Sequence, residues 1–205
     1  MPTLLLKNAE LVLAMDDAHR RFRNAGILVR DNVIEAVGSV EETGLEADHV
    51  IDAQGMLLMP GLVNTHHHLY QTLTRAVPGA QNAELFPWLK TLYPIWANMD
   101  AEAVHVSALV GLAELMLSGC TTAADHLYIY PNDVTLDDEI CAAQEIGIRF
   151  HATRGSMSRG ESQGGLPPDR VVESEPEIIK DSQRVIELYH DPNPQAMLRI
   201  AVAPC

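Results

Sequence analysis

The sequence predicts an α/β fold built on a parallel sheet, and two observations along the chain support this prediction. Residues 1–57 contain short apolar runs separated by turn residues, which is typical of strands. From residue 58 onward, strand-like and helix-like patterns alternate, as they do when parallel strands are joined by helices. We therefore expect a small β domain at residues 1–57 and an α/β domain at residues 58–205.

The first 57 residues are expected to form strands only. A two-residue hairpin turn is predicted at Asp31-Asn32, because asparagine tolerates a positive φ. So small a β layer cannot bury much apolar surface by itself. The expected strands are Leu4–Lys7, Glu10–Ala14, Gly26–Arg30, Val33–Val37, Val50–Ile51 and Met56–Met59.

The remaining residues are expected to alternate between strands and helices. Asp100 is the expected N-cap of the first helix, and Gly119 lies just past its end. A long loop is expected from Tyr70 to Met99, and loops of this length are uncommon unless they cover a site. The expected strands are Leu58–His66, Thr121–His126, Arg149–Arg154 and Leu198–Ala203, and the expected helices are Ala101–Ser118, Asp133–Ile146 and Glu173–Tyr189.

The number of strand units indicates half of a TIM (β/α)8 barrel. Such a barrel has eight strand-helix units and typically needs about 250 residues, whereas four units are predicted here. The sequence stops at Cys205, directly after the fourth strand, so we interpret it as the N-terminal half of a barrel and a fragment of a longer protein. A self-contained four-stranded α/β domain is the alternative, but it would leave long strand edges unpaired.

The segment PGLVNTHHH at residues 60–68 is an apolar strand that ends in three histidines. Because alternate side chains of a strand share a face, His66 and His68 are expected to point the same way and His67 the opposite way. Two imidazoles on one face can bind one metal ion, and histidine is the commonest metal ligand. A structural histidine cluster is the alternative.

These residues carry a resemblance to a known family. The stretch MPGLVNTHHHLYQTLTR resembles the first barrel strand of the amidohydrolase superfamily, and in particular its aminohydrolases of purines and triazines. The resemblance extends over nearly the whole chain and implies that residues 1–57 form half of a β-sandwich completed by a later part of the protein. It is also carried by LFPWLKTLYPIWA, LSGCTTAADHLY, ATRGSMSRGESQGGLPP and IAVAPC.

The resemblance implies a zinc-dependent hydrolase acting on the C–N bonds of cyclic amidines. The expected reaction is the deamination of an oxidised purine, 8-oxoguanine in particular, with release of ammonia. His66 and His68 match the family's metal ligands, and the ion is expected to be Zn²⁺, with Fe²⁺ or Mn²⁺ as alternatives. The family's remaining ligands and its acid-base residues would lie beyond Cys205, so we expect no catalytic residue within this chain.

Other functions remain open at this point. The resemblance also fits an s-triazine amino- or chlorohydrolase, or a deaminase of guanine, cytosine or thioadenosine. A second class is a non-catalytic truncated product, and we expect the isolated 205 residues to be inactive.

Four residues are candidates for binding the substrate. By resemblance, Gln71 binds the purine edge, since an amide both donates and accepts hydrogen bonds. Trp88 could stack on a flat heterocycle, and His126 and Arg154 end two strands beside the expected site. The alternatives are a surface glutamine, ordinary packing of Trp88, a structural histidine and a structural ion pair. Asp125 is expected to point away from the site.

Composition narrows the partners further. The net charge of -14 argues against nucleic-acid binding, which needs clustered Lys and Arg, and a small heterocyclic substrate is expected instead. No apolar run reaches the roughly 18 residues of a membrane helix, so no membrane interaction is expected. Without a signal peptide pattern or paired cysteine spacing, the expected location is the cytoplasm. A homo-oligomer is expected only by analogy with the family.

Overall fold

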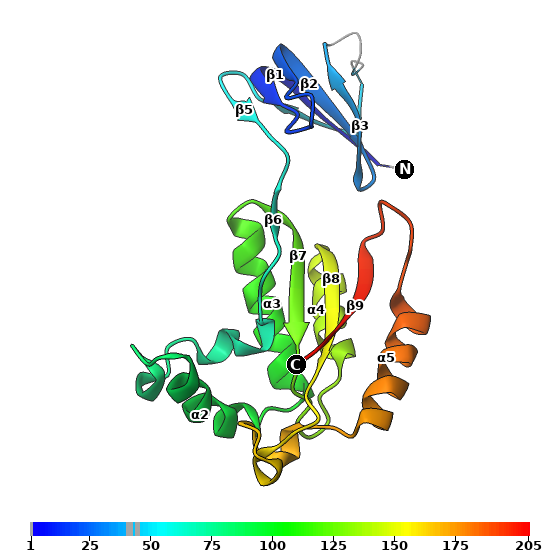
Figure 1. The fold of residues 1–205 in the computed structure, drawn as a ribbon. Helices are drawn as coiled ribbons and strands as arrows, with labels where there is room; N and C mark the ends of the chain where they lie inside the picture. The colour runs from blue at the N-terminus through cyan, green and yellow to red at the C-terminus, as the bar shows by residue number, and fades with distance from the viewer. Residues whose placement is uncertain (1, 40–42, 44–45) are drawn as a thin grey trace. The chain divides into compact units, whose positions relative to one another are not determined.

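The computed structural model describes residues 2–39, 43 and 46–205, and its architecture is α/β. The chain forms two compact units, which divide after Gly61 (Figure 1). The domain boundary predicted between residues 57 and 58 stays a prediction. Among the described residues, no helix combines the length and the hydrophobicity needed to cross a membrane.

The first unit is a five-stranded sheet with a small core. Strand β1 is antiparallel to β2 and parallel to β4 and β5, and β2 is antiparallel to β3. The core consists mainly of small side chains: Ala9, Val12, Ala25, Ile27 and Ala53. The strands are β1 (Thr3–Leu13), β2 (Arg21–Arg30), β3 (Val33–Gly38), β4 (His49–Asp52) and β5 (Leu57–Leu58).

Several details of this sheet differ from the sequence prediction, and β2 begins at Arg21 and not at Gly26. Leu4–Lys7 and Glu10–Ala14 were expected as separate strands, but both belong to β1. Asn8 adopts a φ of 62°, and the pairing register shifts between Leu6 and Ala9, so the chain forms an irregularity without leaving the sheet. The positive φ of the β2–β3 turn belongs to Asp31, at 53°.

The second unit contains a four-stranded parallel sheet in the order β6-β7-β8-β9, which is also the order along the chain. Helices α3, α4 and α5 lie along one face of this sheet (Figure 1). The predicted strand-helix alternation is therefore confirmed. The strands are β6 (Leu62–Asn64), β7 (Cys120–Leu127), β8 (Arg149–Ser156) and β9 (Leu198–Pro204), and the helices are α2 (Leu85–Trp96), α3 (Ala101–Leu117), α4 (Leu136–Ile146) and α5 (Glu175–Tyr189).

The helix starts follow from their capping residues. The carboxylate of Asp100 accepts a hydrogen bond from the backbone N–H of Ala103 at 2.8 Å, as expected for the N-cap of α3. Helix α4 begins three residues later than expected, because Thr135 and Asp138 form a capping box. Ser174 and Glu177 do the same for α5.

The expected loop from Tyr70 to Met99 is wrong, because much of this segment is helical. Two short 3₁₀ helices, η1 (Leu69–Thr74) and η2 (Pro78–Ala80), precede α2. Helix α2 forms here because it can bury one apolar face against the rest of the second unit. The residues buried from α2 are Leu92, Tyr93 and Trp96.

The two faces of the four-stranded sheet differ in burial. Along the middle of β7 and β8, the side chains that point toward the helices are buried, and those that point the other way are half-buried or exposed. On β7 the buried set includes Ala123, Asp125 and Leu127, and on β8 it includes Phe150, Ala152 and Arg154. We call the side of the sheet that points toward the helices the helix face and the opposite side the open face. The open face carries Ala124, His126, His151 and Thr153.

Candidate metal and substrate site

The three histidines lie at the carboxyl end of the parallel sheet, just beyond β6. The predicted strand Leu58–His66 is too long, since β6 ends at Asn64. The side chain of Asn64 accepts a hydrogen bond from the backbone N–H of His66 at 3.1 Å and turns the chain there. The backbone N–H of His126 then donates to the carbonyl oxygen of His67 at 3.1 Å, which ties the segment to β7.

The imidazoles of His66 and His68 contact each other edge to face, with ring centroids 5.4 Å apart. The ring of His126 lies 5.5 Å from that of His68. Burial lowers the pKa of His67, and its charged neighbours include Arg75, which lowers the pKa further, and Glu114, which raises it. This arrangement pairs His66 with His68, although the histidines lie outside the strand whose alternation suggested the pairing.

The hydrogen bond of His68 determines which ring nitrogen is available. Its Nδ1 lies 2.8 Å from the backbone carbonyl oxygen of His126. A carbonyl only accepts, so Nδ1 carries the proton and Nε2 keeps its lone pair. Metal-binding histidines commonly donate from the second nitrogen in this way, and the bond fixes the ring orientation. The geometry at His68 therefore fits a zinc ligand.

Burial favours the neutral form of the His68 and His126 imidazoles. It lowers the pKa of His68 and of His126 below the usual histidine range, and the other histidines nearby add to this effect. A metal ion binds only the neutral imidazole, so the lowered pKa reduces competition by protons.

Two side chains do not complete a metal site. Within the part of the chain that the structure describes, no group of three or more His, Cys, Asp or Glu side chains is arranged to hold a metal ion. Zinc usually needs at least three protein ligands, so His66 and His68 would not by themselves complete a coordination shell.

Gln71 lies beside the histidines, on η1. It lines a hollow of about 260 Å³ together with His66, His67, His68, Thr72 and Arg75. Its Nε2 is 3.0 Å from the hydroxyl of Tyr70 and 3.3 Å from that of Tyr128. The two tyrosines therefore hold one end of the amide, and the other end is the group available to a ligand.

Trp88 belongs to α2 and packs on the second unit, partly buried. Its ring contacts that of Trp96 at a centroid distance of 5.3 Å, and Trp96 in turn contacts Tyr70. The fully buried Trp96 thus lies between Trp88 and the rings near His68. Stacking of Trp88 on a substrate stays a prediction.

His126 lies on the open face at the end of β7, as expected. It lines a hollow of about 340 Å³ with His66, His68, Thr153 and other residues. Its Nε2 is 3.3 Å from the carbonyl oxygen of Ala203. Gly155 leaves room for this ring, because a side chain there would collide with His126. A contact between His126 and the substrate remains untested.

Arg154 lies on the helix face, on the other side of the sheet from His126. It is 1% exposed, and its guanidinium donates to both carboxylate oxygens of Glu173, to Asp181 and to the carbonyl of Gly155. It also lies 3.8 Å from the ring centre of Tyr130. The structure thus contains the ion pair expected as the alternative role, and substrate binding by Arg154 stays a prediction.

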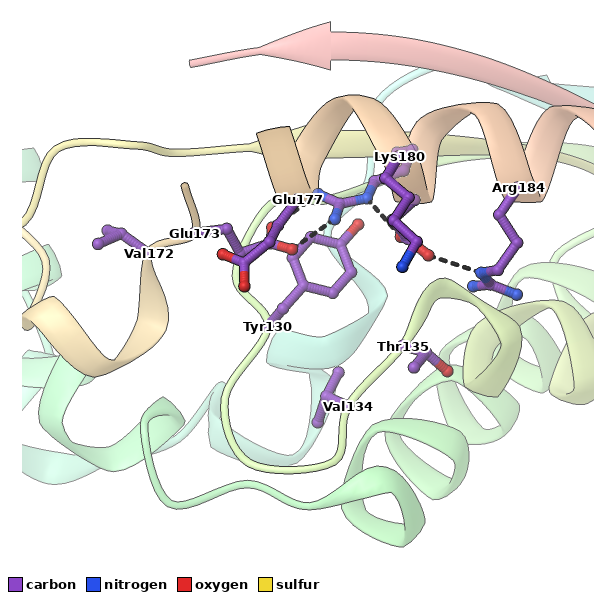
Figure 2. A pocket seen from close by; sticks show the side chains of 10 residues that line it. Tyr130, Val134, Thr135, Val172, Glu173, Glu177, Lys180 and Arg184 are labelled. Carbon is purple, nitrogen blue, oxygen red and sulfur yellow. Dashed lines mark hydrogen bonds and ion pairs between the residues drawn. The ribbon is translucent and has the colours of Figure 1, made fainter. Parts of the chain in front are cut away.

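The residues of this ion pair line a hollow of about 530 Å³. Figure 2 shows Glu177, Lys180 and Arg184 extending from one side of α5 toward Tyr130, Val134 and Thr135. Acidic and basic side chains are mixed here, and the buried guanidinium is already bound. This hollow is therefore a less suitable ligand site than the histidine-lined hollows.

The sequence analysis missed Glu139 and the role of Asp125. Asp125 was correctly expected to point away from His126, but its contact with the histidine segment was not foreseen. Its Oδ1 accepts a hydrogen bond from the backbone N–H of Leu69 at 2.5 Å. Glu139 had a usable signal, because it lies on the apolar stripe formed by Leu136, Ile140 and Ala143 of α4.

The comparisons with known proteins identify the family. The model of the Amidohydrolase family matches residues 57–204. The chain is 46% identical to 8-oxoguanine deaminase from Pseudomonas aeruginosa over 183 residues, which is 88% of this chain and 41% of that protein. It is 34% identical to hydroxydechloroatrazine ethylaminohydrolase from Pseudomonas sp. (strain ADP), covering 100% of this chain and 45% of that protein.

Solved structures of similar proteins support the same family assignment. Atrazine chlorohydrolase from Arthrobacter aurescens TC1, in complex with zinc, superimposes with a TM-score of 0.88 and 34% identity over 98% of this chain and 46% of that one. The triazine hydrolase from the same species gives a TM-score of 0.89, with 100% and 47% coverage. The chain therefore belongs to the amidohydrolase family, and its α/β fold is part of that family's TIM barrel. It spans less than half the length of these relatives.

Proposed function

We propose that the full-length protein is a zinc-dependent hydrolase that deaminates an oxidised purine, with 8-oxoguanine as the best candidate. The observation that carries this proposal is the pairing of His66 and His68 at the carboxyl end of the sheet, with the Nε2 of His68 left free. The zinc-containing relative supports the choice of metal, and the 8-oxoguanine deaminase supports the choice of substrate.

The residues of this chain would contribute to binding and orientation. Bound zinc supplies hydroxide near neutral pH by lowering the pKa of a coordinated water. His66 and His68 would hold the ion, and the His126 carbonyl would fix the tautomer of His68. The acid-base residues are not assigned to any residue of this chain. We therefore propose that the isolated 205 residues are inactive.

Gln71 would distinguish substrates. Its Nε2 is engaged by the two tyrosine hydroxyls, so Oε1 would accept a hydrogen bond from an N–H of the ring. If the amide is turned over, the tyrosines would donate to Oε1, and Nε2 would donate to a ring carbonyl instead. In either orientation one bond to the substrate is expected, because the other end of the amide is held.

The test replaces Gln71 by Leu in the full-length protein. Leaving one substrate group unpaired costs roughly 1–3 kcal/mol, so kcat/KM should fall about five- to 150-fold. Zinc content should not change, since Gln71 is not a proposed ligand. The assay compares 8-oxoguanine, guanine and a hydroxylated aminotriazine and measures ammonia release.

An s-triazine is the second candidate substrate, because two triazine hydrolases are among the similar proteins. The assay separates the two candidates by which heterocycle has the higher kcat/KM. If kcat/KM of Gln71→Leu stayed within about twofold of the parent on every substrate, Gln71 would not bind substrate. If the parent released no ammonia from any purine, the oxidised-purine proposal would fail.

A further inference from the structure

Asp125 on β7 and Glu139 on α4 form a buried pair of carboxyl groups behind the histidine segment. Asp125 is 2% exposed and Glu139 is 0% exposed, and the two carboxyl groups are close enough for each to shift the pKa of the other. Neither takes part in the ion pairs found among the described residues. An uncompensated buried carboxyl pair is expensive, so its presence calls for a physical reason.

The pair is compatible with burial if it keeps a proton. Burial raises the pKa of both carboxyl groups, and the neighbouring Asp125 raises that of Glu139 further. Without this proton, Oδ2 of Asp125 and both oxygens of Glu139 are buried with no hydrogen-bond donor. A proton on Glu139 donated to Oδ2 of Asp125 satisfies that oxygen, and it leaves Oδ1 free for another donor.

That donor belongs to the residue directly after His68. Oδ1 of Asp125 accepts from the backbone N–H of Leu69 at 2.5 Å. His126 follows Asp125 on β7 and makes two further bonds to the histidine segment. Its backbone N–H donates to the carbonyl oxygen of His67, and its carbonyl oxygen accepts from Nδ1 of His68. The peptide groups on both sides of His68 and its ring are thus all held by two consecutive residues of β7.

We propose that Asp125, supported by Glu139, is a positioning residue that fixes the backbone after His68 and so directs its imidazole toward the metal ion. This inference rests on the proposed function, since it requires His68 to bind metal. It assigns a role to two carboxyl groups that touch neither the metal nor the substrate. Side chains that orient a metal ligand typically contribute 10–100-fold to metal affinity.

The test measures metal affinity directly in the full-length protein, by chelator competition with Zn²⁺ and by the visible absorption of the Co²⁺ form. Asp125→Ala should weaken Zn²⁺ binding about 10–100-fold and change the Co²⁺ spectrum. Asp125→Asn should stay close to the parent, because its amide oxygen still accepts from Leu69 and its amide nitrogen donates to Glu139. Ile140→Ala removes a buried side chain from the same helix as Glu139 and serves as the control for general destabilisation.

A second variant covers the case in which Asp125→Ala does not fold. Replacing a buried polar pair by apolar residues is often neutral for stability, so Asp125→Val combined with Glu139→Leu should fold. It lacks the acceptor for Leu69, and its Zn²⁺ affinity should fall as in Asp125→Ala. If the folded double variant bound Zn²⁺ as tightly as Ile140→Ala, the positioning role would be refuted.

A His68→Ala variant separates this inference from the proposed function. If the parent's Zn²⁺ affinity did not depend on His68, both proposals would fail. If it depended on His68 but not on Asp125, only the positioning role would fail.

Discussion

Polar side chains on the helix face of the four-stranded sheet differ in burial from those on the open face. On the helix face, Arg154 and Asp125 are buried, and each has defined hydrogen-bond partners. On the open face, His126 and Thr153 are only partly buried and line a hollow. The difference teaches that polarity alone does not identify a site residue, because the face of the sheet decides whether a polar side chain is buried against the helices or lines a hollow.

The largest expected effect on stability comes from Arg154 on the helix face. Arg154→Met leaves Glu173 and Asp181 without their buried cation, and breaking such a pair from one side costs about 3–5 kcal/mol. We expect a loss near the lower limit, because both carboxylates are partly exposed. Urea unfolding of the full-length protein, followed by tryptophan fluorescence, measures it.

Arg75→Met is the matched control for Arg154→Met. Arg75 also pairs with a glutamate, Glu114, but both side chains are more than half exposed. The unfolding midpoint of Arg75→Met should stay close to that of the parent, since exposed ion pairs contribute little to stability. Equal shifts for the two variants would contradict the difference in burial on which the comparison rests.

A smaller effect is expected at Gly155, which lies beside His126 on the open face. A Cβ at this position would collide with the His126 ring and lie 2.6 Å from the carbonyl oxygen of Leu127. Gly155→Ala should lower the free energy of unfolding by about 1–3 kcal/mol, the usual range for overpacking. Gly79→Ala is the control, because its nearest neighbour would be 3.5 Å away. A normal stability for Gly155→Ala would contradict this, because both the His126 ring and the backbone at Leu127 would then have to shift at no cost.

The smallest effect concerns the stability at acid pH that comes from Asp137 on helix α4. Hydrogen bonds from Arg184, and to a lesser extent from Tyr189, lower the pKa of Asp137 to about 2. A carboxyl group with a lowered pKa stabilises the fold above its unfolded pKa, and this contribution disappears as the pH falls from about 4 toward 2. Asp137→Asn should therefore lose less stability than the parent over this range.

The expected difference for Asp137→Asn is at most about 1 kcal/mol, because the ion pair is partly exposed. Urea midpoints measured at pH 5, 4 and 3 would show it. Identical pH dependence in the two proteins would mean that Arg184 does not lower the pKa of Asp137.

Much of the fold could be predicted from the sequence because its patterns are local. Asp100 and Gly119 indicated the limits of α3, and the alternation of strands and helices indicated the parallel sheet. The segment of helix α2 was interpreted as a loop, and it contains Pro87 and Pro94, a residue type that disfavours the interior of a helix. Its helical structure depends on burying Trp96, a tertiary contact that the local pattern does not show.

The site could be predicted only in part, for a similar reason. The pairing of His66 with His68 follows from their spacing, but the histidines lie after β6 and depend on hydrogen bonds from β7. Arg154 was expected to end its strand, but β8 continues to Ser156, and the face of Arg154 depends on the register with β7, where it lies beside Leu127. Register is set by pairing between distant segments, and a single sequence does not specify it.

The most direct test of the account is the zinc content of the full-length protein and of four single histidine variants. The parent should hold at least one zinc ion per chain, and His66→Ala and His68→Ala should lose it. His67→Ala and His151→Ala should keep it, because His67 is not paired with the other two and His151 lies elsewhere on the open face. Mass spectrometry of the metal in purified protein gives the answer. Loss of zinc in His66→Ala and His68→Ala alone is the predicted result, and full zinc content in His68→Ala would contradict the account.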